Sequence, residues 1–168
     1  MSNLPDWVRH PARAIADAMQ GPEHATGDVN PAERTDDGPA KARVLCVDDN
    51  PQVLRLLKRQ LGDAYDLALA QTAQDALVQM ESGEPFDVIV SDLRMPEVHG
   101  LAFLKKAREL YPDTERIILT GLPDPATMSV ARAAGGAEQL IVKPWTKAEL
   151  IEAVENGVRR RREAASGR

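Results

Sequence analysis

The hydrophobic pattern of the chain changes near residue 42. From Arg43 onward, short apolar runs alternate with longer stretches in which apolar side chains recur every three or four positions. The first pattern predicts strands and the second predicts amphipathic helices. The expected strands cover 44–47, 65–70, 87–92, 116–120 and 140–143, and the expected helices begin near Asn50, Thr72, Gly100, Asp124 and Thr146.

Cap residues support these helix assignments. Asn50 precedes Pro51 in the order expected of an N-cap and a first helical position. Thr146 and Glu149 have the spacing of a capping box. Five strands that alternate with five helices predict an α/β fold, in which helices cover both faces of a parallel sheet. The weak run at 65–70 is expected at an edge of that sheet.

The first 42 residues differ from the rest of the chain. They are rich in proline and glycine, and between Gly21 and Ala42 they contain few large apolar side chains, which predicts a mostly disordered extension. Trp7 and its apolar neighbours could form one short amphipathic helix. That helix either packs loosely as a tail or docks on a partner or on a second copy. The folded domain is expected at 43–162 and a C-terminal tail at 163–168.

Composition limits the partners and the cellular compartment that we expect for this chain. The chain has 168 residues, enough for one domain with some surplus, and its net charge of -5 argues against nucleic acid as the main partner. Its single cysteine, Cys46, lies in an apolar run and is expected to be buried. We find neither a signal peptide nor an apolar run long enough to span a membrane, so we expect a cytoplasmic protein. His10, His24 and His99 have no metal-like spacing.

Polar residues end four of the five expected strands. Asp48 and Asp49, Asp92, Thr120 and Lys143 would all meet at one edge of a parallel sheet. Two carboxylates 4 Å apart repel each other by about 4 kcal/mol at an effective dielectric constant of 20, and a divalent cation would relieve this repulsion. Oxygen ligands with open positions suit Mg2+.

The same residues suit phosphoryl transfer. Lys143 supplies a positive charge and Thr120 supplies a hydroxyl group that can donate to phosphoryl oxygens. Asp92 can then act as a nucleophile and form an aspartyl-phosphate. Each of these residues alone also has an ordinary structural explanation, such as a surface lysine or a carboxylate that caps a helix. Their coincidence at the ends of four strands is what indicates chemistry.

Four motifs resemble the receiver domain of two-component response regulators, and they occur in its order across about residues 43–160. They are Val47-Asp48-Asp49-Asn50, Ser91-Asp92-Leu93-Arg94-Met95-Pro96, Leu119-Thr120-Gly121 and Val142-Lys143-Pro144-Trp145. The resemblance implies a flavodoxin-like, doubly wound sheet with strand order 2-1-3-4-5. It implies that Asp92 accepts a phosphoryl group from a sensor histidine kinase or a phosphotransfer protein, with no other enzymatic activity than this self-phosphorylation and slow autodephosphorylation.

The resemblance also assigns the surrounding roles. Asp49, Asp92 and the backbone carbonyl of Arg94 would bind Mg2+, with Asp48 acting partly through water, and Thr120 and Lys143 would contact the phosphoryl group. Receivers often have an aromatic switch residue three positions before the lysine, where this chain has Leu140.

The signalling surface would comprise the fourth helix, the fifth strand and the fifth helix, with Trp145 close to it. Because no output domain follows Val158, the chain is expected to be a stand-alone receiver that binds an unknown downstream protein or a second copy.

Other interpretations concern the arginine run near the C-terminus and the function of the whole domain. The run Arg159–Arg162 either complements the dipole of the last helix or binds an anionic partner. The whole domain could be an interaction module that works without phosphate, although such a module would be expected to have lost acidic or lysine positions. A phosphatase of the haloacid dehalogenase class needs two aspartates separated by one residue, whereas Asp48 and Asp49 are adjacent.

Overall fold

The five strands form one parallel sheet with the order β2-β1-β3-β4-β5. The computed structural model describes residues 40–95, 100–121 and 123–167. The strands are β1 (Arg43–Val47), β2 (Asp66–Ala70), β3 (Val88–Asp92), β4 (Glu115–Thr120) and β5 (Gln139–Val142). The predicted flavodoxin-like fold is confirmed, including the edge position of the strand at 65–70.

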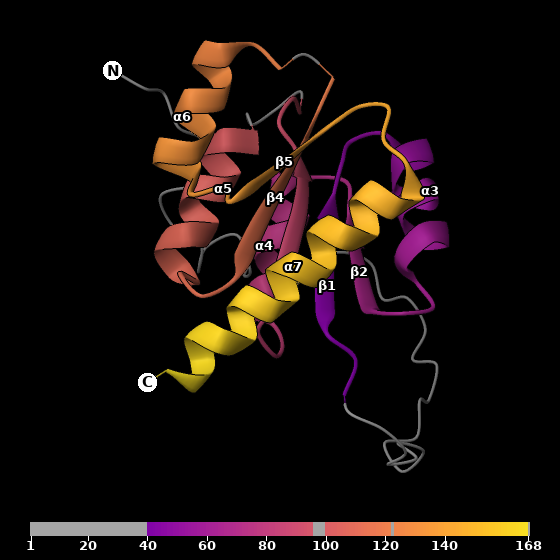
Figure 1. Ribbon diagram of the computed structural model, residues 1–168, viewed down its shortest axis with the longest axis vertical. Coiled ribbons are helices and arrows are strands. Elements are labelled where there is room, and N and C mark those ends of the chain that lie inside the picture. Colours follow the sequence, from indigo (N-terminus) through magenta and orange to yellow (C-terminus); the bar gives the residue numbers. More distant parts are fainter. Residues whose placement is uncertain (1–39, 96–99, 122, 168) are drawn as a thin grey trace, which may run out of the picture.

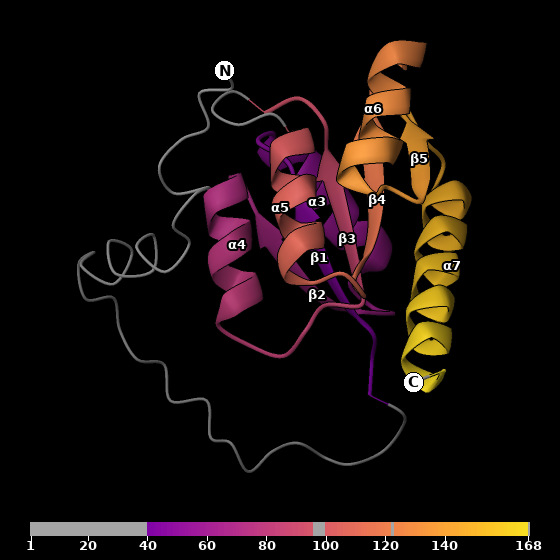
Figure 2. The ribbon, with the colours of Figure 1, turned by 90° about the vertical axis from the view of Figure 1, so that its left-hand side faces the viewer.

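Helices cover both faces of the sheet (Figures 1 and 2). They are α3 (Pro51–Leu61), α4 (Ala73–Glu81), α5 (Gly100–Leu110), α6 (Pro125–Gly135) and α7 (Lys147–Ser166). One buried cluster joins the sheet to α4, α5 and α6, and a second joins it to α3 and α7. Figure 1 shows α7 crossing in front of the sheet. The sheet is therefore the middle of three layers.

β3 is the most enclosed strand, and all five of its residues are buried. Successive side chains of a strand point to opposite faces. Accordingly, Ile89 belongs to the cluster under α4 and α5, while Val88 and Val90 belong to the cluster under α3 and α7. A run of β-branched residues with no polar alternation suits a strand that helices cover on both sides.

The predicted N-cap residues form hydrogen bonds with backbone N–H groups at the helix starts. The Asn50 side chain accepts a hydrogen bond from the Gln52 N–H at 2.9 Å, with Pro51 at the start of α3. The Thr72 hydroxyl accepts from the Asp75 N–H at 3.0 Å. Thr146 and Glu149 form a reciprocal capping box at the start of α7. These caps satisfy backbone N–H groups that have no partner within the helix.

Helix ends are less well predicted than helix starts. α4 ends at Glu81 with Ser82 as its C-cap, directly before Gly83. α7 continues to Ser166, four residues beyond the predicted domain end at 162, so residues 163–166 are helical rather than a tail. The Arg160 guanidinium binds Glu115 at 2.9 Å and holds this part of α7 against β4. That contact explains why the helix outlasts its apolar pattern.

Some predictions fall outside the described residues. The expected extension at 1–42, apart from its last three residues, lies there, and so do His10, His24 and His99. Within the described part of the chain, no helix is long and apolar enough to cross a membrane. Cys46 is buried as predicted, and this burial raises the pKa of its thiol to about 12.

Candidate functional site

Three carboxylates meet at the C-terminal edge of the sheet. Asp48 directly follows β1, and Asp92 ends β3, beside it in the parallel register. One carboxylate oxygen from each of Asp48, Asp49 and Asp92 lies within 4.8 Å of the others. Asp48 and Asp92 are buried, at 1% and 7% exposure, while Asp49 is exposed. The structure therefore brings together the three predicted acids, with one open side.

Lys143 provides the positive charge of this cluster. Its Nζ atom lies 3.1 Å from Asp48 Oδ2 and 3.4 Å from Asp92 Oδ1. The backbone N–H of Lys143 donates to the Thr120 carbonyl oxygen at 2.7 Å, which ties the end of β5 to the end of β4. The Lys143 ammonium group thus lies between the carboxylates of Asp48 and Asp92, although the lysine follows β5 at the edge of the sheet.

Asp48 is held at both carboxylate oxygens. The Asn50 N–H donates to its Oδ1 at 2.8 Å, and the Lys143 ammonium donates to its Oδ2. Burial and the nearby Asp92 charge raise the pKa of Asp48, and the hydrogen bonds from Asn50 and Lys143 only partly oppose this rise. The buried charge of Asp48 is therefore costly, and a cation near it would be favourable.

Thr120 and Arg94 take the positions that the sequence predicts for them. Thr120 is buried at the end of β4 and pairs in register with Val142 of β5, one residue before Lys143. Arg94 lies two residues after Asp92 and its side chain is exposed. A role for its backbone carbonyl in metal binding stays a prediction.

Gly100 shapes the site in a way that sequence reasoning missed. A Cβ atom at this position would lie 2.1 Å from the Asp92 carbonyl oxygen and 2.9 Å from the Leu93 Cα. The Gly100 N–H also donates to the Leu93 carbonyl oxygen at 3.0 Å. The start of α5 therefore rests on the backbone that carries Asp92. The available signal was a glycine at the predicted start of a helix, a position where the sequence gives no reason for a close backbone contact.

Trp145 makes a contact with α3 that the sequence does not predict. Its Nε1–H donates to Gln60 Oε1 of α3 at 2.9 Å, and its ring packs against the cluster under α3 and α7. Trp145 thus lies between β5 and α7, half-buried, and a part for it in the surface of α6, β5 and α7 stays a prediction. The hydrogen bond draws the indole toward α3, and the 85 residues between the partners hide this contact from sequence patterns. Leu140 packs partly buried against the cluster on the opposite face.

The donor set fits a hard divalent cation. It consists of carboxylate oxygens, with a third acid open to water, as Mg2+ prefers. The cluster of Asp48, Asp49 and Asp92 could therefore hold a metal ion. The adjoining lysine and threonine suit a bound anion such as a phosphoryl group.

Comparison with known proteins agrees with this geometry. A family model described as "Response regulator receiver domain" matches residues 44–155. The hydrogenase transcriptional regulatory protein HoxA of Bradyrhizobium diazoefficiens is 35% identical over 68% of this chain. The transcriptional regulatory protein TrcR of Mycobacterium tuberculosis is 32% identical over 80% of it.

Solved structures show the same fold. The signal receiver domain of an HD domain-containing protein from Pseudomonas fluorescens aligns with a TM-score of 0.73 and 28% identity, over 79% of this chain and 98% of that one. The chemotaxis protein CheY4 of Vibrio cholerae aligns with a TM-score of 0.66 and 32% identity, over 70% of this chain and 98% of that one.

The match to the curated relatives is confined to part of each of them. The chain spans 24% of the length of HoxA and 51% of the length of TrcR. Within this chain, however, the matched residues 44–155 include all five strands except Arg43 of β1, and every acid, threonine and lysine of the strand-end site. The chain therefore belongs to the family of response regulator receiver domains.

Proposed function

We propose that this receiver accepts a phosphoryl group on Asp92 and signals through the resulting change in protein binding. The observation that carries the proposal is the position of Lys143, whose ammonium group lies between Asp48 and Asp92 and beside a third acid. A purely structural cluster would gain little from three acids around one lysine, because the excess negative charge is partly buried.

The proposed step is a nucleophilic displacement at phosphorus. A carboxylate oxygen of Asp92 forms the new bond to phosphorus, and the bond from phosphorus to the donor breaks. The bonding electrons leave with the donor, which is the imidazole nitrogen of a histidine kinase or phosphotransfer protein. Thr120 and Lys143 then donate to the phosphoryl oxygens. Water later hydrolyses the acyl-phosphate and releases inorganic phosphate, and we propose no other enzymatic turnover.

Mg2+ fits the acids around Asp92. Asp49 and Asp92 would hold the ion together with the Arg94 carbonyl, and Asp48 would act partly through water. A bound ion would supply positive charge beside the phosphoryl oxygens. Asp92 is then a nucleophile held by two fixed features of the chain, namely the Lys143 ammonium group and the close backbone contact with Gly100.

The output would come from the surface of α6, β5 and α7. Phosphorylation adds about -1.5 to -2 charge units and new acceptor oxygens, toward which Thr120 and Lys143 would move. Both residues adjoin β5, and exposed Val142 of β5 and exposed Val130 of α6 are large apolar side chains near that surface. A downstream protein or a second copy would bind there. We propose a cytoplasmic location, where a histidine kinase domain would act.

Chemical phosphorylation tests this function. The purified chain is incubated with acetyl phosphate and Mg2+, and its intact mass is measured. We expect the wild type to gain one phosphoryl group that hydroxylamine removes, and we expect Asp92→Asn to gain none. Asp75→Asn, an exposed acid at the start of α4, is the matched control and should label like the wild type.

Two results would contradict the proposal. One is a wild type that stays unlabelled although it is folded and Mg2+ is present. The other is equal labelling of the wild type and Asp92→Asn. Either result would favour an interaction module that works without phosphate.

A further inference from the structure

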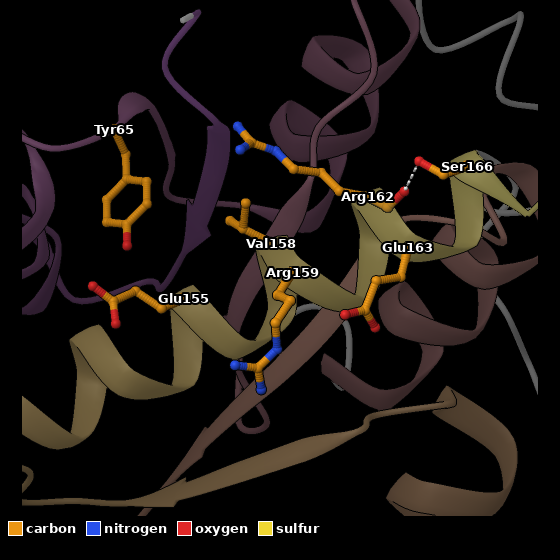
Figure 3. A pocket seen from close by; sticks show the side chains of 7 residues that line it. All are labelled: Tyr65, Glu155, Val158, Arg159, Arg162, Glu163 and Ser166. Atoms are coloured by element: carbon orange, nitrogen blue, oxygen red, sulfur yellow. Dashed lines mark hydrogen bonds between the residues drawn. The ribbon is translucent and has the colours of Figure 1, made fainter.

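An open groove of about 440 Å³ lies on the last turns of α7 (Figure 3). Val158, Arg159, Arg162 and Ser166 line it from the helix, and Tyr65 closes one end. Tyr65 precedes β2, so the groove lies at the opposite end of the sheet from Asp92. It is therefore separate from the strand-end site.

The groove has an apolar floor and charged sides. Val158 and the Tyr65 ring belong to or pack on the buried cluster under α3 and α7. Figure 3 shows the Tyr65 hydroxyl pointing toward the Glu155 carboxylate, and Arg162 extending on the same side of α7 as Val158. Burial and the Glu155 charge raise the pKa of Tyr65, so its hydroxyl keeps its proton at neutral pH.

Two arginines of the groove have no acidic partner among residues 40–95, 100–121 and 123–167. The Arg159 guanidinium donates only to the neutral Asn156 side chain, at 2.7 Å, and no ion pair of Arg162 is found in those ranges. Arg160, by contrast, is paired with Glu115. The groove thus offers two arginines without an acidic partner, next to the carboxylates of Glu155 and Glu163.

The polypeptide enters the sheet beside this groove. The Asp66 N–H donates to the Ala42 carbonyl oxygen at 3.0 Å, so Ala42 lies next to the residue that follows Tyr65. The Lys41 ammonium group also donates to the Asp63 carbonyl oxygen at 2.9 Å. Ala42 and Val158 belong to the same buried cluster. Ala42 therefore lies close to the end of the groove that Tyr65 lines.

The residues that precede Ala40 carry the complementary charge. Between positions 28 and 39 the chain has four acids and one base, namely Asp28, Glu33, Asp36, Asp37 and Arg34. Asp37 is five residues before Ala42, a span of at most roughly 18 Å when extended. Arg162 lies one helical turn beyond Val158, roughly 6 Å along α7. The acids are thus within reach of the unpaired arginines.

We propose that the groove is a docking site for residues 33–39 of the same chain, with the carboxylates of Asp36 and Asp37 beside the guanidinium groups of Arg159 and Arg162. The apolar floor accommodates the backbone and Pro39. Glu155 and Glu163 also line the groove, so an acidic segment would have to place its carboxylates at the two guanidinium groups and away from these glutamates.

A disulfide-trapping experiment on the full chain tests this docking. Thr35→Cys is combined with Ser166→Cys, which leaves all the proposed charges in place, and disulfide formation under mild oxidation is followed by non-reducing electrophoresis. The control pair is Thr35→Cys with Glu84→Cys. Glu84 is exposed, and its carbonyl oxygen accepts a hydrogen bond from Arg43, so it is also close to the start of β1. Buried Cys46 does not compete, because its thiol stays protonated.

We expect an intramolecular disulfide that forms roughly threefold to tenfold faster in the groove pair than in the control pair, as two surface ion pairs of ordinary strength would give. Asp36→Lys with Asp37→Lys should remove this advantage, and adding Arg159→Glu with Arg162→Glu should restore it. Equal rates for the two pairs, or a rate unaffected by charge reversal, would overturn the proposal. So would disulfide-linked dimers as the main product, because they would identify a second copy as the occupant.

Discussion

Lys143 sets the charge balance of the strand-end site. It is the cation within 3.4 Å of both buried acids, and its side chain is 25% exposed. We predict that Lys143→Met lowers the free energy of unfolding in Mg2+-free buffer by roughly 1–3 kcal/mol, less than for a fully buried pair because water partly screens the lysine. Urea unfolding measures this effect.

The matched control for this change is Lys147→Met, which removes an exposed lysine from the first turn of α7. It should alter stability by less than about 0.5 kcal/mol. A Lys143→Met variant as stable as this control would show that the buried acids do not depend on the ammonium group.

Gly100 is required because the Asp92 backbone leaves no room for a side chain. We predict that Gly100→Ala destabilises the fold by roughly 1–3 kcal/mol or more, since the added methyl group would overlap the Asp92 carbonyl oxygen. The same displacement should slow labelling of Asp92 by acetyl phosphate. Thermal unfolding and intact mass report the two effects.

Gly121→Ala is the control for Gly100→Ala, because a Cβ atom at Gly121 would meet no other atom within 4 Å. It should leave stability nearly unchanged. If the two alanine variants behaved alike, the close contact at Gly100 would not constrain the site.

At the residue scale, the sequence predicted which polar residues meet at the site better than it predicted the packing around them. The positions of Asp48, Asp92 and Lys143 follow from their places at strand ends, because parallel strands bring their carboxyl ends to one edge. The contact of Trp145 with Gln60 and that of Gly100 with Asp92 depend on side-chain direction and loop path. Neither contact produces a periodic pattern in the sequence.

At the scale of elements, α6 is anchored by two arginines from neighbouring elements. Arg108 of α5 donates to the Ala133 carbonyl oxygen at 3.1 Å, and Arg116 of β4 donates to that of Gly136 at 3.1 Å. Arg116 is buried and also donates to the Thr114 carbonyl oxygen. Gly136, with φ of 60°, turns the chain back at the end of α6. The carbonyls at this end of the helix thus have partners.

We predict that Arg116→Met destabilises the protein by roughly 1–3 kcal/mol, because it leaves two carbonyl groups without their donor. Hydrogen exchange should accelerate in α6 more than in α3, which lies on the other face of the sheet. Mass spectrometry of peptides after exchange in D2O measures both helices.

Arg132→Met, an exposed position on α6 itself, serves as the control for Arg116→Met. Uniform acceleration across all helices in Arg116→Met would mean that the arginine stabilises the fold globally and does not anchor α6 in particular.

The elements themselves were predictable, and their boundaries only in part. Caps such as Thr146 with Glu149 mark a helix start through local hydrogen bonds that sequence spacing encodes. The end of α7 was not predictable, because a contact with Glu115 of β4 stabilises it across 45 residues. Helix starts are thus a local property here, whereas this helix end depends on tertiary structure.

For the whole molecule, Mg2+ should couple site occupancy to stability. Its proposed ligands come from the ends of β1 and β3, so an ion that binds only the folded chain should raise the free energy of unfolding. At ten times the dissociation constant the expected gain is about 1.4 kcal/mol. Urea unfolding at increasing Mg2+ concentration, with EDTA as the metal-free reference, measures it.

Asp49→Asn should remove most of this gain, because Asp49 is the open acid of the cluster. The equally exposed Asp63→Asn, on the loop before β2, should retain it. Equal Mg2+ dependence in both variants would place the ion elsewhere.

The path of α7 limits how the two ends of the molecule can influence each other. The helix begins after Thr146, three residues from Lys143, and its 20 residues extend roughly 30 Å, with the groove along its second half. Salt screens exposed charges beyond about 8 Å at physiological ionic strength. A charge gained at Asp92 therefore acts only weakly on Arg162. Between the two ends, α7 lies close to β3 at Gly157, where an added Cβ atom would be 3.0 Å from a Val88 methyl group, so a side chain at this position would displace the middle of the helix from the sheet.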